Sequence, residues 1–355
     1  MSRGVVVVGL SGGVDSSAAA ALLLDQGYDC VGVTLRHLPP EAANTCCSLE
    51  AIVDARRVAK RLGIRHEIVD MEEPFRRAVI EPFEEAYLAG RTPNPCAWCN
   101  RSIKFGALWE WARGIGADYL ATGHYARVVE RNGRRELWRA VDREKDQSYI
   151  LYALGPDDLA HVLFPLGTWT KAEVRAFAAA RGLVTAAKPD SQELCFVPQN
   201  DYRRYLETHR PEAVAPGDMV DPEGRPVGRH RGIAFYTVGQ RRGLGLAGPE
   251  PWYVVRLEPD TNRVVVGPRQ FVQSAGCVVE EVNYPDGGPP RAFVGEALVR
   301  AHGRPAPCRW EPDGPDRATL WFDTPQWAVT PGQVAVAYQG DQLVAGGRIR
   351  EALAP

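Results

Sequence analysis

A glycine-rich turn near the N-terminus has the composition of a phosphate-binding site. It follows the apolar run 5–8 and consists of Gly9, Leu10, Ser11, Gly12, Gly13, Val14, Asp15 and Ser16. A helix-forming stretch, 18–24, comes directly after it. Backbone N–H groups and the positive end of a helix dipole would therefore converge on one anion. The turn lacks the Walker A lysine that reaches a β- or γ-phosphate, and it fails the dinucleotide fingerprint G-x-G-x-x-G at the third position, which disfavours both of those classes.

Cysteines supply a second kind of chemistry. Cys96 and Cys99 form a C-x-x-C pair in a proline-rich loop that we expect just before a helix, whose dipole would favour the thiolate. Cys195 stands alone in a second polar loop, 188–196. Eight cysteines in a chain with no secretory features do not indicate a disulfide scaffold, because reducing compartments keep thiols free.

The phosphate turn and the cysteines must be positioned by a folded domain, and the pattern of the first 205 residues predicts which fold this is. Short apolar runs alternate with amphipathic stretches, the pattern of βαβ units and a doubly wound parallel sheet in an α/β domain. The predicted strands are 5–10, 30–35, 66–70 and 119–122, and the predicted helices are 14–26, 49–62 and 101–112.

Beyond residue 205 the texture changes to short β-branched runs separated by proline and glycine. We predict two small, β-barrel-like domains, 206–284 and 285–355, divided at the Pro/Gly-rich stretch 285–290. The segment 225–249 interleaves arginines with aromatic residues and contains no acid. That pattern suits RNA phosphates and bases, although a solvated face of a β domain would look the same.

The overall composition excludes several classes of protein. The 355 residues are 45% hydrophobic and 24% charged, with a formal net charge of -2, so any nucleic-acid footprint must be local. No stretch approaches 18 apolar residues, and the N-terminus lacks a signal-peptide pattern. We therefore expect no membrane association and a cytoplasmic location.

The glycine-rich turn matches the S-G-G-x-D-S motif of PP-loop ATP pyrophosphatases, which cleave ATP between its α- and β-phosphates. With the other motifs, the chain resembles the tRNA-specific 2-thiouridylase family over nearly its whole length. These motifs are 46–48, 54–59, 94–105, 121–125, 145–149, Cys195, 236–244 and 330–333. The resemblance implies ATP and Mg²⁺ as cofactors and two partners, a tRNA anticodon stem-loop with a wobble uridine and a protein or persulfide that donates sulfur.

The resemblance also implies residue roles. Cys99 would be the nucleophile and Cys195 the persulfide carrier, while Asp15 would help to hold Mg²⁺ and Leu35 and Gly123 would contact adenosine. The remaining implied contacts are to the target base, from Asn94, Pro95 and Cys96, and to tRNA, from Lys145, Asp146, Gln147, Arg300 and Ala301. ATP would adenylate the uridine C2 oxygen, and sulfur would then replace it.

Two departures from the family pattern leave alternatives open. Cys96 stands where much of the family has Asp, so Cys96, Cys99 and Cys195 could instead ligate a [4Fe–4S] cluster with one open iron. Zinc would normally need a fourth ligand. Ala301 and His302 replace the usual Tyr and Arg, which weakens a tRNA contact there. The rival functions are a synthetase that adenylates a small carboxylate or amide and a non-catalytic iron–sulfur or RNA-binding module.

Overall fold

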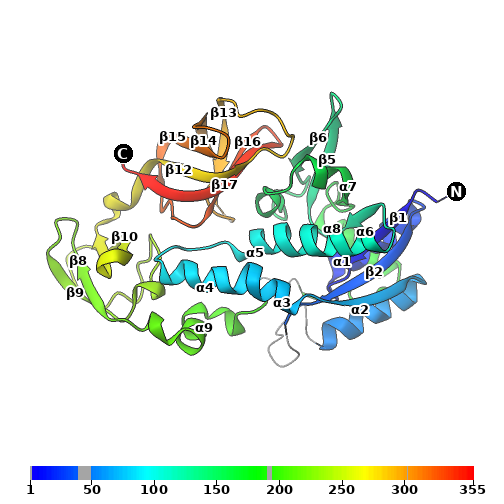
Figure 1. Cartoon of the computed structure of the whole chain (residues 1–355), viewed down its shortest axis with the longest axis horizontal. Helices are drawn as coiled ribbons and strands as arrows, with labels where there is room; N and C mark the ends of the chain where they lie inside the picture. Colours follow the sequence, from blue (N-terminus) through cyan, green and yellow to red (C-terminus); the bar gives the residue numbers. More distant parts are fainter. Residues whose placement is uncertain (1, 39–48, 190–193, 302) are drawn as a thin grey trace.

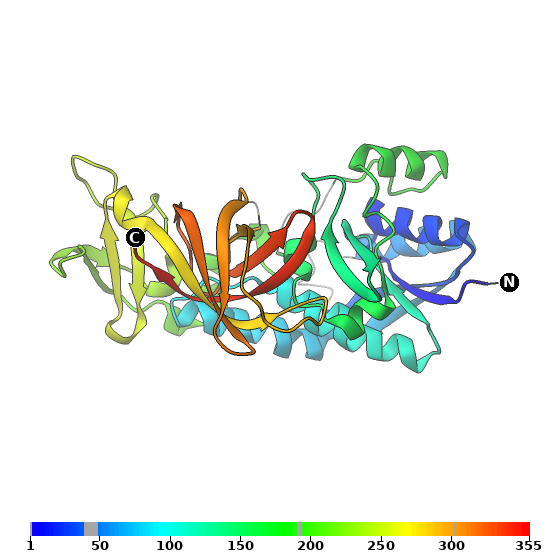
Figure 2. The ribbon, with the colours of Figure 1, turned by 90° about the horizontal axis from the view of Figure 1, so that it is seen from above.

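The computed structural model describes residues 2–38, 49–189, 194–301 and 303–355, so Cys46, Cys47 and His302 lie outside the described residues. The α/β part lies at one end of the elongated molecule and a small four-stranded sheet at the other (Figure 1). A β-barrel lies between them, as the view from above also shows (Figure 2). Within the described part of the chain, no helix is long and apolar enough to cross a membrane.

The α/β part is built on a parallel sheet with the order β3-β2-β1-β4-β7. Its strands are β1 (Val5–Gly9), β2 (Asp29–Arg36), β3 (Arg65–Asp70), β4 (Tyr119–Ala121) and β7 (Val162–Leu163). Because β1 lies between β2 and β4, the strand order reverses there, and its carboxyl end is the place where α/β sheets bind ligands. The predicted doubly wound fold is confirmed, with four of its strands found within a residue or so of their expected bounds.

Helices cover this sheet and extend beyond it. Helices α1 (Val14–Asp25), α2 (Leu49–Leu62) and α8 (Lys171–Ala180) belong to the sheet-covering set. A second set comprises α3 (Glu72–Phe75), η1 (Arg76–Ile80), α4 (Glu81–Leu88), α5 (Pro95–Trp98), η2 (Cys99–Ala107) and α6 (Leu108–Gly114). The runs α3–α4 and α5–α6 are each continuous and pass beneath the barrel in Figure 1. Two shorter helices are α7 (Pro156–His161) and α9 (Tyr202–His209).

Two β parts complete the fold. The four-stranded sheet has the order β10-β11-β8-β9, with β8 (Gly217–Val220), β9 (Pro226–His230), β10 (Tyr253–Glu258) and β11 (Arg263–Gly267). The barrel contains β12 (Gln273–Asn283), β13 (Phe293–Leu298), β14 (Ala306–Pro312), β15 (Arg317–Trp327), β16 (Val334–Gln339) and β17 (Gln342–Leu353). Pairing of β12 with β17 closes it around a core that includes the fully buried Trp310. Since β12 pairs with β15 and β17, the barrel strands include residues before the expected division at 284–285.

One hairpin joins the first part to the barrel. Strands β5 (Ala126–Arg131) and β6 (Arg134–Arg139) follow β4 in sequence, yet β6 pairs with β17 through Trp138 and Gln342. The ion pair of Arg127 with Asp341, 2.7 Å long, supports the same junction. A hairpin that follows the α/β sheet in sequence therefore extends the sheet of the barrel, which the sequence did not indicate.

Candidate active site

The glycine-rich turn forms the expected bend between β1 and α1. The Ser16 hydroxyl accepts a hydrogen bond from the Ser11 N–H at 3.2 Å, and the Ser17 hydroxyl donates to the Gly13 carbonyl at 2.8 Å. Gly12 has a φ of +71°, and a Cβ built there would lie 2.4 Å from the Ala51 carbonyl oxygen of α2. Only glycine fits this position, because both the left-handed backbone and the close approach exclude a side chain. The turn is thus held from both ends before any ligand arrives.

A cavity of about 250 Å³ opens at this turn. Seven residues expected to bind ATP line it, namely Gly9, Leu10, Ser11, Asp15, Ser16, Leu35 and Gly123. Gly12, Gly13 and Val14 belong to the turn and to the start of α1 but not to the cavity lining. A Cβ on Gly123 would lie 2.7 Å from the Ser16 backbone nitrogen, so β4 can approach α1 only through a glycine. The structure therefore gathers the phosphate turn and both expected adenosine contacts around one cavity, here called the nucleotide cavity.

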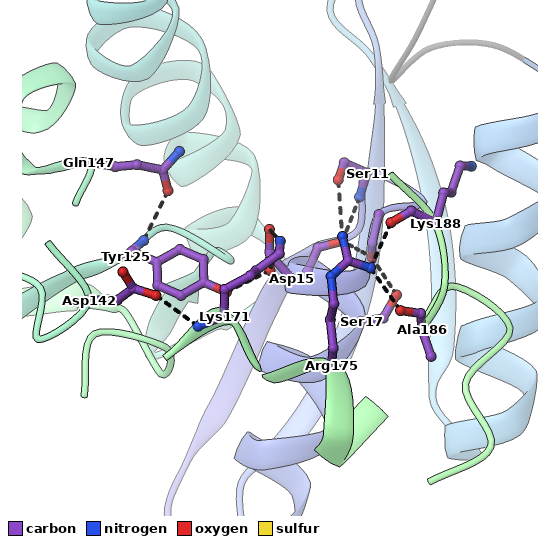
Figure 3. Close-up of polar contacts among 12 residues, drawn as sticks. Ser11, Asp15, Ser17, Tyr125, Asp142, Gln147, Lys171, Arg175, Ala186 and Lys188 are labelled. Carbon is purple, nitrogen blue, oxygen red and sulfur yellow. Dashed lines mark hydrogen bonds and ion pairs between the residues drawn. The ribbon is translucent and has the colours of Figure 1, made fainter. Parts of the chain in front are cut away.

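A lysine that the sequence analysis missed lies at the turn. The Lys171 ammonium, on the first residue of α8, is 2.7 Å from each carboxylate oxygen of Asp15, and the Tyr125 hydroxyl donates to the same carboxylate at 2.8 Å (Figure 3). Lys171 is well buried, with 13% of its side chain exposed. The turn itself contains no lysine that could reach a phosphate as the Walker A lysine does. Lys171, which is 156 residues from Asp15 in sequence, supplies a positive charge beside the turn instead.

Helix α8 also holds the segment that leads toward Cys195. The Arg175 guanidinium donates to the Ala186 and Lys188 carbonyls at 2.9 Å each, and the Lys188 ammonium lies 2.8 Å from Asp54 on α2 (Figure 3 shows the first two contacts). A capping box between Thr170 and Glu173 fixes the start of this helix. One short helix thus contacts both the phosphate turn and the approach to the distant thiol.

The C-x-x-C cysteines lie in a helix and not in the expected loop before it. Asn94 caps the helix by accepting a hydrogen bond from the Ala97 N–H at 3.2 Å, and Pro95 occupies the first helical position, where its missing N–H costs nothing. Cys96 is exposed and Cys99 is half-buried. From Cys99 onward the helix widens to a π-helix, a feature frequent at functional sites. Lys104, five residues later and so one π-helical turn along, lines the nucleotide cavity.

Cys195 comes from a different part of the chain but contacts the same core. It is half-buried, and Phe196 beside it packs edge-to-face on Phe75 and Phe83 at centroid distances of 5.9 and 5.0 Å. Cys99 and Cys195 both pack against the core cluster that contains these three phenylalanines. The buried Cys30, Cys277 and Cys308 are free thiols. Residues 190–193, just before Cys195, lie outside the described residues.

Sequence comparisons cover the whole of this arrangement. A family profile described as the tRNA methyl transferase HUP domain matches residues 4–199. A second profile, described as the tRNA methyl transferase PRC-barrel domain, matches residues 203–268. A third, described as the aminomethyltransferase β-barrel domain, matches residues 274–349. A tRNA-specific 2-thiouridylase MnmA from Carboxydothermus hydrogenoformans is 49% identical, and the match covers 99% of both chains. The chain belongs to the tRNA-specific 2-thiouridylase family. Another member, from Chloroflexus aurantiacus, is 50% identical over 97% of this chain and 98% of its own.

Solved structures resemble this family member less closely. The U34-tRNA thiolase NcsA from Methanococcus maripaludis, with its [4Fe-4S] cluster, superposes with a TM-score of 0.37 at 21% identity. The match covers 59% of this chain and 67% of NcsA. Assignment to the family therefore comes from the sequence relatives and the profiles.

The residues expected to contact tRNA fall into two groups. Asp146 and Gln147 are engaged within the protein: Asp146 accepts hydrogen bonds from Ala140 and Ser148, and Gln147 accepts one from the Tyr125 N–H at 3.0 Å. Burial raises the pKa of Asp146, and Gln147 lines the nucleotide cavity. Arg300 and Ala301 are exposed after β13, and Lys145 is half-buried. Their contacts with RNA stay predictions.

The described thiols do not assemble into a metal site. Among residues 2–38, 49–189, 194–301 and 303–355, no group of three or more His, Cys, Asp or Glu side chains could hold a metal ion. Asp15 lines the nucleotide cavity, and Mg²⁺ usually takes one or two carboxylates beside the phosphates of ATP.

Proposed function

We propose that this protein uses ATP to convert a wobble uridine of tRNA to 2-thiouridine. One observation carries the proposal beyond family membership: the helix that contains Cys99 also lines the nucleotide cavity through Lys104 and Leu108. An activated base and a sulfur-transferring thiol must meet at one atom, and a single helix that contributes to both sites supports this proposal.

In the first step, the uridine O2 attacks the α-phosphorus of ATP, and pyrophosphate leaves. The turn from Ser11 to Ser16 would hold the departing pyrophosphate with backbone N–H groups. Asp15 would hold Mg²⁺, which neutralises phosphate charge when bound. Lys171 would then turn from Asp15 to the phosphate oxygens, so that its positive charge is kept in the site.

In the second step, the terminal sulfur of a Cys195 persulfide attacks C2 of the adenylated base. Cys99 attacks the inner sulfur, the S–S bond of the persulfide breaks, and AMP leaves with the former O2. The two cysteines end as a disulfide, which a dithiol reductant must return to thiols. The sulfane sulfur gains the two electrons that the cysteines lose, so the step is balanced.

The direct test incubates the protein with ATP, a persulfide donor and unmodified tRNA, followed by nucleoside mass spectrometry. We expect 2-thiouridine together with one AMP per thiolated tRNA. ATP–pyrophosphate exchange that proceeds at full rate without RNA would instead support a synthetase for a small carboxylate or amide.

We propose the persulfide route for sulfur transfer, with the cluster route as the alternative. Cys96→Asp separates the two, since it restores the usual family residue and removes one of the cluster's three ligands. We expect the variant to keep most of its thiolation activity when purified without iron. Loss of both activity and protein-bound iron in Cys96→Asp after anaerobic purification would contradict the persulfide route. A dedicated sulfur-donor protein and a cytoplasmic location are further parts of this proposal.

A further inference from the structure

A second cavity, of about 310 Å³, lies between the α/β part and the barrel. Helix α4 supplies Glu85, the loop after it supplies Arg91, and the helical run α5–η2 supplies Trp98 and Arg101. The barrel closes the other side with Glu281 and Arg348. No lining residue is shared with the nucleotide cavity. This junction cavity is therefore a separate site.

Three of its side chains make no hydrogen bond or ion pair with any other described residue. Trp98 is half-buried, makes no ring or cation–π contact, and its indole N–H donates no hydrogen bond. The guanidinium groups of Arg91 and Arg101 are exposed and make no ion pair or hydrogen bond. Arg348, in contrast, is paired with Glu280 and Glu281 at 3.0 and 2.6 Å. The Trp98 indole and two exposed guanidinium groups line one cavity, and this combination can bind a nucleobase and its phosphates.

The helix of Cys99 separates the two cavities. Trp98 and Arg101 face the junction cavity, whereas Lys104 and Leu108 face the nucleotide cavity. Cys99 directly follows Trp98 in this helix. An RNA chain that presents one base to Cys99 would thus have its next nucleotide near Trp98, because successive nucleotides in RNA are only a few ångströms apart.

The barrel holds the wall of this cavity in place. The Gln333 amide donates to the Thr92 and Pro93 carbonyls at 3.2 and 3.1 Å, and the Thr92 N–H donates to the Pro331 carbonyl at 2.9 Å. A Cβ on Gly332 would lie 2.9 Å from the Thr92 backbone, so the approach requires a glycine. The motif 330–333, which the reaction itself does not use, therefore orders the loop that carries Arg91.

We propose that the junction cavity binds a nucleotide of the tRNA anticodon loop next to the target uridine. Its base stacks on the Trp98 indole, and its phosphates contact Arg91 and Arg101. The carboxylate of Glu85 is placed to accept from base N–H groups, and the cavity volume is near that of small-molecule sites. This inference rests on the proposed function, since it needs tRNA as the substrate.

The test measures the affinity of an anticodon stem-loop RNA in which each loop nucleotide is replaced in turn by an abasic one. Trp98→Leu keeps apolar bulk but removes the stacking face, and we expect about 5- to 150-fold weaker binding. One abasic position should cause the same loss in the wild type and no further loss in Trp98→Leu. If the loss of affinity from Trp98→Leu multiplied with the loss from every abasic position, the proposal would be overturned. Unchanged affinity of Trp98→Leu for the RNA would also overturn it, and this is the result expected if a free mononucleotide fills the cavity.

A second pair of variants guards against misfolding of Trp98→Leu. Arg101→Gln changes an exposed, unpaired side chain, and we expect a shallower dependence of RNA affinity on salt, by about one unit in the log–log slope. Arg113→Gln is the matched control, because Arg113 is exposed on the next helix but pairs with Glu110. Equal slopes for the two variants would refute the site. A wild-type protein that binds no stem-loop RNA would instead end the proposed function together with this inference.

Discussion

The nucleotide cavity and the thiol pair differ in how they are built. The phosphate turn is held by its own hydrogen bonds, by the close contact of Gly12 with α2 and by the Lys171–Asp15 ion pair. Cys99 and Cys195, however, come from two separate segments, both of which pack against the same hydrophobic core. The nucleotide cavity is thus preorganised, which favours tight positioning of ATP, whereas the two thiols belong to segments that are far apart in the chain.

This difference predicts that the two half-reactions can be separated by mutation. Changes at the thiols should stop sulfur transfer but leave ATP binding intact. Changes at the phosphate turn should reduce both, because sulfur cannot replace an oxygen that has not been adenylated. The four predictions below test this separation.

Replacement of the nucleophile should have the largest effect. We expect Cys99→Ser to lower the rate of 2-thiouridine formation by at least about 10³-fold, since the persulfide then has no thiol to release its sulfur. Pyrophosphate release with tRNA present should continue, because the nucleotide cavity is untouched. Cys30→Ser is the control: burial raises the pKa of this thiol to about 11, and it lies far from the chemistry in the β-sheet core. A thiolation rate in Cys99→Ser close to that of the control would contradict the assigned role.

Removal of the cation at the phosphate turn should come next. Lys171→Met keeps the length of the side chain but leaves the pyrophosphate without its charge partner, and we expect kcat/KM for ATP to fall by about 10²- to 10³-fold. Pyrophosphate release is the measurement. Lys188→Met removes a half-buried lysine that pairs with Asp54 outside the cavity and should have a much smaller effect. Equal losses in both variants would mean that Lys171 acts only through stability.

A smaller effect is expected where the turn meets α2. Gly12→Ala places a Cβ against the Ala51 carbonyl and forces a side chain into a left-handed backbone, so we expect weaker ATP binding and a loss of about 2–4 kcal/mol in unfolding free energy. Gly27→Ala is the matched control, because Gly27 also has a positive φ but no atom lies within 4 Å of a Cβ there. It should lose only about 1 kcal/mol, the cost of the backbone alone. Equal losses in urea titrations of the two variants would rule out the contact with Ala51.

The features that could be predicted from the sequence are those that depend on residues close together in the chain. The strands and the phosphate turn follow from local periodicity and from glycines at fixed spacing, and the structure has them where they were expected. Asn94 and Pro95 were interpreted as part of a loop, although an Asn followed by Pro is also a helix cap and first turn, which is the arrangement found.

Features that depend on distant residues were not predictable from the sequence. Lys171 reaches Asp15 across 156 residues, and nothing in its own segment distinguishes it from a surface lysine at a helix start. The pairing of β6 with β17 joins residues from two predicted domains, and no local pattern encodes which sheet edge a hairpin will join. The same limit applies to the junction cavity, whose lining joins residues between 78 and 102 to barrel residues between 281 and 348, far along the chain.

The smallest expected effect concerns the pH dependence of stability at the nucleotide cavity. His124 lines this cavity, and its Nδ1 lies 2.7 Å from the Thr122 hydroxyl. Burial lowers the pKa of His124 well below its usual value, and the positive charge of Lys104 lowers it further. The folded protein therefore keeps this imidazole neutral at a pH where the unfolded chain has already bound a proton.

The sign of the pH effect follows from this difference in proton binding. His124 contributes stability above the unfolded pKa of about 6.5, and the contribution is lost at up to about 1.4 kcal/mol per pH unit as the pH falls below that value. His124→Asn removes the titrating group, so the advantage of the wild type over the variant should shrink by about 1.4 kcal/mol between pH 7.5 and pH 5.5. Chemical denaturation at both pH values measures it, with the exposed His161→Gln as control. If the difference in unfolding free energy between the wild type and His124→Asn stayed constant across this range, the fold would not keep the buried imidazole neutral. The nucleotide cavity would then be more hydrated and less preorganised than its contacts indicate.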